Sequence, residues 1–136
     1  ICTDTSTFCT PGVNIGLFCA TPMVAVTRAA HPKQAMEMLL TGDFIDAPTA
    51  LHYGLLNRVV PIDQLDAAVE ELVAAIVTKP KVAIRMGKEL VYRQREMGLE
   101  AAYQLAGQTM ALNMMDADAQ EGAQAFAEKR LPAWRH

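Results

Sequence analysis

The chain has 136 residues, of which 51% are apolar and only 6% aromatic, and its formal net charge is -3 at pH 7. This length suffices for one domain with a hydrophobic core, and an apolar content carried by Ala, Leu, Val and Met favours packed helices over a β-sandwich. The negative charge argues against a general nucleic-acid binder, which needs clustered Lys and Arg, and no apolar run reaches the roughly 20 residues that span a bilayer.

Residues 1–19 are predicted to form strand and loop. In "TFCTPGVNIG", residues 7–16, the pair Pro11 and Gly12 marks a sharp turn after a strand near residues 6–10. This strand finds no partner in the rest of the sequence, and an unpaired strand leaves backbone N–H and C=O groups unsatisfied. Because the chain also begins with Ile1 rather than Met, we expect the C-terminal half of a larger fold, whose own N-terminal half supplies the pairing strands.

Helical patterns occupy most of the chain after residue 20, interrupted by one short strand near residues 57–60. Each helix is expected to begin at a capping residue or a Pro and to end at a Gly or Pro. The predicted helices begin at Thr21 as a cap, run from Pro32 to Thr41 before Gly42, from the cap Asp46 to Gly54, from the cap Asp63 (with Asp66 in a capping box) to Pro80, from Lys81 to Met97, from Leu99 to Met115, and from the cap Asp118 (with Glu121 in a capping box) to Arg130.

Apolar residues recur at helical spacing in these segments and predict the buried faces. The methionines at such spacings are expected to lie in the core or in a subunit interface. The predicted inward-facing residues are Ala35, Met38 and Leu39, then Leu65, Val69, Leu72, Val73 and Ile76, and finally Leu99, Ala102, Tyr103, Ala106 and Met110.

Nucleophilic and metal chemistry find little support in the sequence. Ser6 is the only serine and lies in no G-x-S-x-G motif. The cysteines, Cys2, Cys9 and Cys19, fit neither a zinc site nor a disulfide framework and are expected to be buried or half-buried packing thiols in a reducing compartment. His31 and His52 lack neighbours at ligand spacing, so we expect no metal site.

The charged residues leave two interpretations open. The acids near loops do not form a poised pair, because Asp46 is explained as a helix cap. Lys81, Arg85, Lys88 and Arg95 share one side of a helix, which is typical of a solvated face but also suits a phosphate-bearing ligand or an acidic partner.

Three stretches together resemble the crotonase (enoyl-CoA hydratase/isomerase) superfamily. They are "STFCTPGVNIGL", "AMEMLLTGDFIDAPTALHYGLLNRVVP" and "DAQEGAQAFAEKRLPAW", and the middle one is the most specific. The resemblance covers the whole chain but only the second half of the family's fold. It implies an α/β fold class: the C-terminal half of a ββα spiral, mostly helical, with residues 1–60 as the end of the spiral core and residues 61–136 as a helical region for trimerisation and CoA capping.

The resemblance also implies chemistry on a CoA thioester through an enolate. In these relatives, two backbone N–H groups of the upstream half stabilise the enolate, and such donors each contribute about 3–4 kcal/mol. The family's hydratases carry a catalytic glutamate in a Phe-x-x-Pro-Glu motif. Here Phe8 and Pro11 match, and Gly12 stands at the glutamate position. Losing an acid–base group typically lowers rates by about 10²–10⁴-fold, so ordinary hydration is not expected, and the fragment alone is not expected to be active.

Two residues of the last helix are predicted to bind the substrate. Phe126 and Lys129 match positions that in relatives reach the adenine and phosphate end of CoA. An aromatic face can stack on adenine, an ammonium suits a phosphate, and residues three apart share a helix face. The alternative is that Phe126 belongs to the core and Lys129 to the solvated surface.

The sequence therefore predicts an enoyl-CoA hydratase/isomerase-like enzyme, a lyase or isomerase, that binds an acyl-CoA substrate and needs no further cofactor. It is expected to form a homotrimer or hexamer and to act in the cytoplasm, or in mitochondria if eukaryotic. Two alternatives remain: a non-catalytic acyl-CoA-binding or regulatory relative, and a helical interaction module without a CoA connection.

Overall fold

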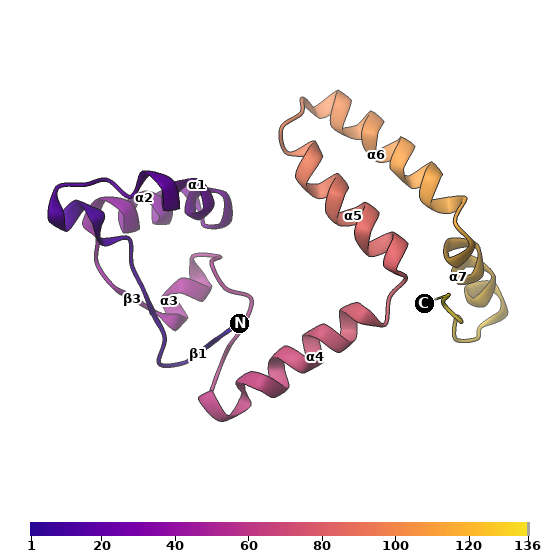
Figure 1. Ribbon diagram of the computed structural model, residues 1–136, viewed down its shortest axis with the longest axis horizontal. Coiled ribbons are helices and arrows are strands. Elements are labelled where there is room, and N and C mark those ends of the chain that lie inside the picture. The colour runs from indigo at the N-terminus through magenta and orange to yellow at the C-terminus, as the bar shows by residue number, and fades with distance from the viewer. Residues whose placement is uncertain (136) are drawn as a thin grey trace. The chain divides into compact units, whose positions relative to one another are not determined.

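The computed structural model describes residues 1–135, which form two compact units that divide between Glu71 and Leu72 (Figure 1). The chain is mostly helical with short strands, as predicted. The first unit contains β1 Cys2–Thr3, β2 Thr7–Phe8, a 3-10 helix Pro11–Ile15, α1 Ala20–Ala29, α2 Pro32–Thr41, β3 Ile45–Asp46, α3 Ala47–His52, β4 Val59–Val60 and a 3-10 helix Ile62–Gln64. Helix α4, Leu65–Val77, follows, and the second unit continues with α5 Lys81–Gln94, α6 Leu99–Met114 and α7 Ala117–Glu128.

The prediction that the leading strand lacks a partner within the chain is wrong. β1 pairs in parallel with β4, where Cys2 lies opposite Val59, and β2 pairs antiparallel with β3, where Phe8 lies opposite Ile45. Strands of two residues are too short to show an alternating pattern. The sequence therefore does not predict β3, and within residues 1–19 it predicts one strand where the structure has β1 and β2. Both sheets have only two strands, and such small sheets contribute little stability on their own.

Helix α2 supplies the core of the first unit. As predicted, Ala35, Met38 and Leu39 are buried, and Leu39 is 0% exposed. The helix ends at Gly42 in the left-handed conformation, φ 66°, whose N–H donates to the carbonyl of Met38. Ala30, Ala47 and Ala50 complete the buried apolar set of this unit.

Helix caps follow the sequence in one case and depart from it in three. Asp46 caps α3 by accepting a hydrogen bond from the N–H of Thr49 at 2.8 Å, as predicted. Helix α1 begins at Ala20, one residue before the expected cap Thr21, and Asp63 lies inside a 3-10 helix. Helix α7 is capped by Asp116 instead of Asp118, because Asp116 accepts from the N–H of Asp118 at 2.9 Å.

The second unit is built from a helical hairpin. Figure 1 shows α5 and α6 side by side, and these helices pack against each other. Several residues predicted to face inward are instead exposed: Leu99 by 76%, Tyr103 by 72% and Met110 by 65%. In α4, Val69, Val73 and Ile76 are likewise exposed. Leu65, Leu72, Ala102 and Ala106 of the same predicted faces are half-buried, so the described chain covers these faces only in part.

After α7 the chain turns back along the helix. Glu121 accepts hydrogen bonds from both terminal nitrogens of Arg130, at 2.6 and 3.0 Å, and from the N–H of Ala133 at 2.8 Å. Asp118 is buried and accepts from the N–H of Arg135 at 2.8 Å. A Cβ added to Gly122 would lie 3.1 Å from the ring of Trp134, so the ring packs closely against this glycine. We call residues 129–135 the C-terminal return.

Leu39 tests the core. Leu39→Ala should lower the free energy of unfolding by about 2–5 kcal/mol, because the truncation leaves a cavity in the first unit. Leu40→Ala is the matched control: Leu40 is 59% exposed, so its loss should change stability by no more than about 0.5 kcal/mol. Urea denaturation measures both, and equal effects would contradict the assigned core.

The role of Glu121 in the C-terminal return can be tested by the pH dependence of the free energy of unfolding. Hydrogen bonds, first from the Arg130 side chain and then from the N–H of Ala133, lower the pKa of Glu121 to about 2. A lowered folded-state pKa contributes stability above the unfolded value and loses it as pH falls towards the folded value. The stability difference between the unmodified chain and Glu121→Gln should therefore be constant above about pH 5.5 and shrink below about pH 4.5. Urea denaturation followed by fluorescence of Trp134, the only tryptophan, measures it, and a pH-independent difference would contradict the ion pair.

Candidate functional site

The loop around Gly12 is closed by its own backbone. It consists of the 3-10 helix Pro11–Ile15 and the turn that leads into α1. The N–H of Leu17 donates to the carbonyl of Gly12 at 2.9 Å, and the N–H of Gly12 donates to Sγ of Cys19 at 3.2 Å. Both hydrogen bonds bring the far side of the loop directly against Gly12.

This closure leaves no room for a side chain at residue 12. A Cβ built on Gly12 would lie 2.6 Å from the carbonyl oxygen of Leu17 and 2.8 Å from Sγ of Cys19, closer than real Cβ atoms approach. The nearer obstacle is backbone and cannot rotate away. The glycine is required by contact rather than by dihedral angle, because Gly12 is not among the residues with positive φ.

Helix α2 holds this loop in place. The hydroxyl of Thr10 is buried and donates to the carbonyl of Met38 at 2.8 Å, and the side-chain amide of Asn14 donates to the carbonyl of Gly42 at 3.3 Å. A Cβ on Gly42 would meet Val13 at 2.9 Å. Gly42 thus ends α2 and also lets Val13 of the loop pack closely against the end of the helix. Both roles explain the glycine in the "LLTGD" stretch.

Phe126 and Lys129 lie together at the C-terminal end of α7, in the second unit. Phe126 is 87% exposed, so it is not part of the core that residues 1–135 form among themselves. Lys129 lies just beyond the last helical residue, with φ 54°, so the two residues do not share a helix face as predicted. The N–H of Lys129 donates to the carbonyl of Phe126 at 3.2 Å, and the N–H of Arg130 to that of Ala125 at 3.0 Å. This pair of hydrogen bonds is the Schellman motif, in which the left-handed residue is usually glycine.

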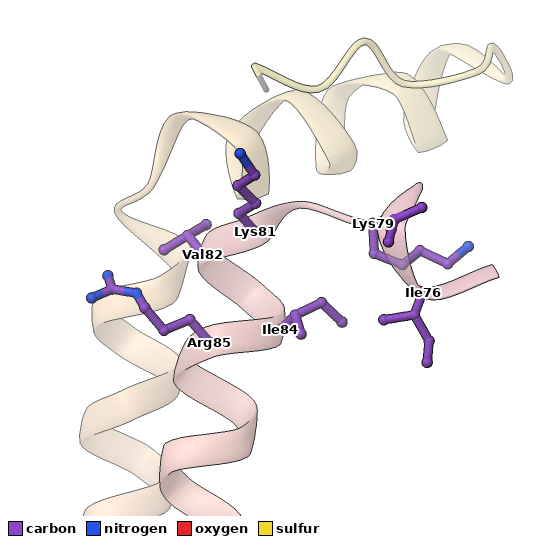
Figure 2. A pocket seen from close by; sticks show the side chains of 7 residues that line it. Ile76, Lys79, Lys81, Val82, Ile84 and Arg85 are labelled. Atoms are coloured by element: carbon purple, nitrogen blue, oxygen red, sulfur yellow. The ribbon is translucent and has the colours of Figure 1, made fainter. Parts of the chain in front are cut away.

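A groove of about 640 Å³ lies where α4 leads into α5. Figure 2 shows Ile84 extending from α5 on the side where Ile76 lies, whereas Val82 and Arg85 extend from the other side of the helix. Lys81 and Arg85, two of the four basic residues that the sequence placed on one side of this helix, are among the residues that line the groove. The complete lining is Ile76, Val77, Lys79, Lys81, Val82, Ile84 and Arg85.

The remaining candidates form no site. The cysteines are free and half-buried, as predicted. Within residues 1–135, no group of three or more His, Cys, Asp or Glu side chains is arranged to hold a metal ion. Over the same residues, no helix combines the length and the apolar character that crossing a membrane requires.

Sequence reasoning missed the roles of Glu121 and Arg130. Glu121 was assigned to a capping box with Asp118, but its carboxylate binds Arg130 instead. The available signal was the run Arg130, Leu131, Pro132 directly after the helix, since a Pro so close to a helix end directs the chain away from the axis. Nothing in the spacing of Glu121 and Arg130, nine residues apart, identifies them as a pair.

Comparison with known proteins gives one consistent answer. A family model described as enoyl-CoA hydratase/isomerase matches residues 1–136. The mitochondrial enoyl-CoA hydratase domain-containing protein 3 of Mus musculus is 45% identical over 136 residues, which are 100% of this chain and 45% of that protein. Carnitinyl-CoA dehydratase of Citrobacter koseri is 33% identical over 141 residues, covering 99% of this chain and 54% of that protein.

Solved structures agree. The crystal structure of an enoyl-CoA hydratase from Mycobacterium smegmatis matches with a TM-score of 0.94 at 52% identity, covering 97% of this chain and 51% of that one. Human enoyl-CoA hydratase domain-containing protein 3 matches with a TM-score of 0.91 at 44% identity, covering 97% and 52%. The chain spans about half the length of the curated relatives it matches. Because the family model matches every residue and the backbone follows these structures, the chain belongs to the enoyl-CoA hydratase/isomerase family of the crotonase superfamily.

Proposed function

We propose that the whole protein binds an acyl-CoA thioester and acts on it through an enolate, as an enoyl-CoA hydratase/isomerase-like enzyme. The observation that carries this proposal is the end of α7, where the 87%-exposed Phe126 precedes Lys129 by three residues. An exposed aromatic ring can stack on adenine, and the ammonium group of a lysine is a point charge suited to a phosphate. No cofactor beyond the thioester substrate is needed for this chemistry.

Acid–base catalysis does not come from residue 12. Glycine has no group that transfers a proton, and the contacts with Leu17 and Cys19 exclude a longer side chain. We propose that proton transfer falls to a carboxylate elsewhere in the whole protein or to water, and that the enolate is stabilised by backbone N–H donors outside this chain.

A second candidate is favoured by the same closed loop. A relative that binds acyl-CoA without turnover needs the Phe126 and Lys129 surface but no acid–base group at residue 12. A regulatory or non-catalytic role would tolerate a loop in which Leu17 and Cys19 occupy the space for a side chain at residue 12. The two candidates differ in turnover and not in binding.

We also propose that the protein assembles into a homotrimer or hexamer and works in mitochondria if it is eukaryotic, since the similar mouse and human proteins are described as mitochondrial. Assembly is supported by the apolar side chains that α5 and α6 leave exposed, including Tyr92, Leu99 and Tyr103. Exposed apolar surface of this kind marks interaction sites.

Turnover separates the candidates. The whole protein should bind crotonyl-CoA in calorimetry and hydrate it at least about 100-fold more slowly than a family hydratase with glutamate at the matching position. Measurable hydration or double-bond isomerisation supports the enzyme, and binding without any turnover supports the non-catalytic relative. Absence of binding would contradict both.

Gly12 is tested by an alanine variant and a glutamate variant. Gly12→Ala should lower stability because of the contacts at 2.6 and 2.8 Å, and Gly12→Glu should bring no gain in hydration. Gly87→Ala is the matched control: no atom lies within 4 Å of its added Cβ, and it lies inside α5, so it should raise stability by about 0.5–1 kcal/mol. A Gly12→Ala variant as stable as the unmodified protein would contradict the closed loop.

Assembly is tested by light scattering on the whole protein. The unmodified protein should have three or six times the protomer mass, and Tyr103→Asp should shift it towards the monomer. Gln104→Asp, on an adjacent exposed position of α6, should leave the mass unchanged. A monomeric unmodified protein would contradict the proposed assembly.

A further inference from the structure

Lys129 has an unusual backbone. Among residues 1–135 it is the non-glycine residue with positive φ, at 54°, whereas the other left-handed positions are Gly16, Gly42 and Gly54. A left-handed lysine is strained, and glycine is the preferred residue at this position of a Schellman motif. A strained residue persists only when its surroundings hold it in place.

Arg130, the residue after Lys129, is fixed by two carboxylates. The two terminal nitrogens of Arg130 donate to the carboxylate of Glu121 at 2.6 and 3.0 Å, and Nε of Arg130 donates to Glu128 at 2.6 Å. A bidentate pair of this kind fixes both distance and orientation. Because Arg130 directly follows Lys129, these contacts restrict the dihedral angles of the turn at Lys129.

Glu121 also holds the rest of the C-terminal return. The oxygen that accepts from Arg130 also accepts the N–H of Ala133 at 2.8 Å. Two residues of the return, Arg130 and Ala133, thus depend on one carboxylate. The next residue of the return, Trp134, lies against Gly122, which directly follows Glu121 on α7. Removing Glu121 frees both Arg130 and Ala133, whereas removing Glu128 frees only one contact of the return, that with Nε of Arg130.

We propose that Glu121 is a positioning residue for ligand binding: by holding Arg130, it keeps the turn at Lys129 left-handed and so directs the lysine ammonium group to the phosphate of the CoA thioester. This inference rests on the proposed function. Glu121 itself does not touch the ligand in this arrangement, and it acts only through the position of Lys129.

A double-mutant cycle in the whole protein tests this role, with acetyl-CoA as the ligand in calorimetry. Lys129→Gln removes the cation while retaining a residue of similar length, and should weaken binding about 10-fold. Glu121→Gln should weaken binding by about 3–10-fold, and should have no further effect once Lys129→Gln is present. Additive effects, or unchanged affinity in Glu121→Gln, would overturn the proposal.

Trp134 fluorescence reports the C-terminal return independently of ligand. Glu121→Gln should shift its emission to longer wavelength, while Glu100→Gln, an exposed acid in the first turn of α6, should leave emission and affinity unchanged. Arg130→Lys provides a second variant, because lysine keeps the charge but not the bidentate geometry, and should reproduce the loss of affinity. Unshifted emission in Glu121→Gln would overturn the positioning role. Lack of acetyl-CoA binding by the unmodified protein would instead overturn the proposed function itself.

Discussion

The loop at Gly12 depends on one constraint: the Leu17 carbonyl oxygen and Sγ of Cys19 occupy the space that a Cβ on residue 12 would need. Residue 12 therefore not only lacks a side chain but has no space for one, since the nearest atom belongs to the backbone of Leu17. The loop is held in this state by its own backbone hydrogen bonds and by the side chains of Thr10 and Asn14, which donate to carbonyls at the end of α2. The loop is thereby fixed in a conformation that has no space for a side chain at residue 12.

The end of α7 carries the two side chains that are proposed to bind the ligand. Phe126 offers an aromatic face to solvent, and Lys129 carries a cation on a strained residue where glycine would be more stable. A lysine there is less stable than glycine, and the next residue, Arg130, is ion-paired with Glu121 and Glu128. On the proposed function, the end of α7 supplies the binding groups, whereas the loop at Gly12 has no space for an acid–base side chain. This combination is compatible with slow enolate chemistry or with binding alone.

The sequence was most informative where local rules decide the structure. Gly42 ends α2 because a left-handed residue is needed there, and Asp46 caps α3 because its short side chain reaches an unpaired N–H.

Prediction from the sequence failed where residues far apart in the chain determine the structure. The pairing of β2 with β3 joins residues almost forty positions apart, and each strand is too short to leave a pattern. Glu121 satisfied a capping pattern, yet Arg130 offers a charged partner that outweighs a capping hydrogen bond. The apolar faces of α4 and α6 were recognised, but periodicity cannot say what covers a face. The Phe-x-x-Pro match located Gly12, although only coordinates reveal that the position is filled.

The most direct test is a crystal structure of the whole protein bound to a non-reactive thioether analogue of an acyl-CoA. The account predicts the adenine ring against Phe126, a phosphate oxygen within hydrogen-bonding distance of Nζ of Lys129, a left-handed Lys129, and the loop at Gly12 still closed by Leu17 and Cys19. An analogue bound away from α7, or a loop at Gly12 that opens to present a proton-transferring group, would contradict it.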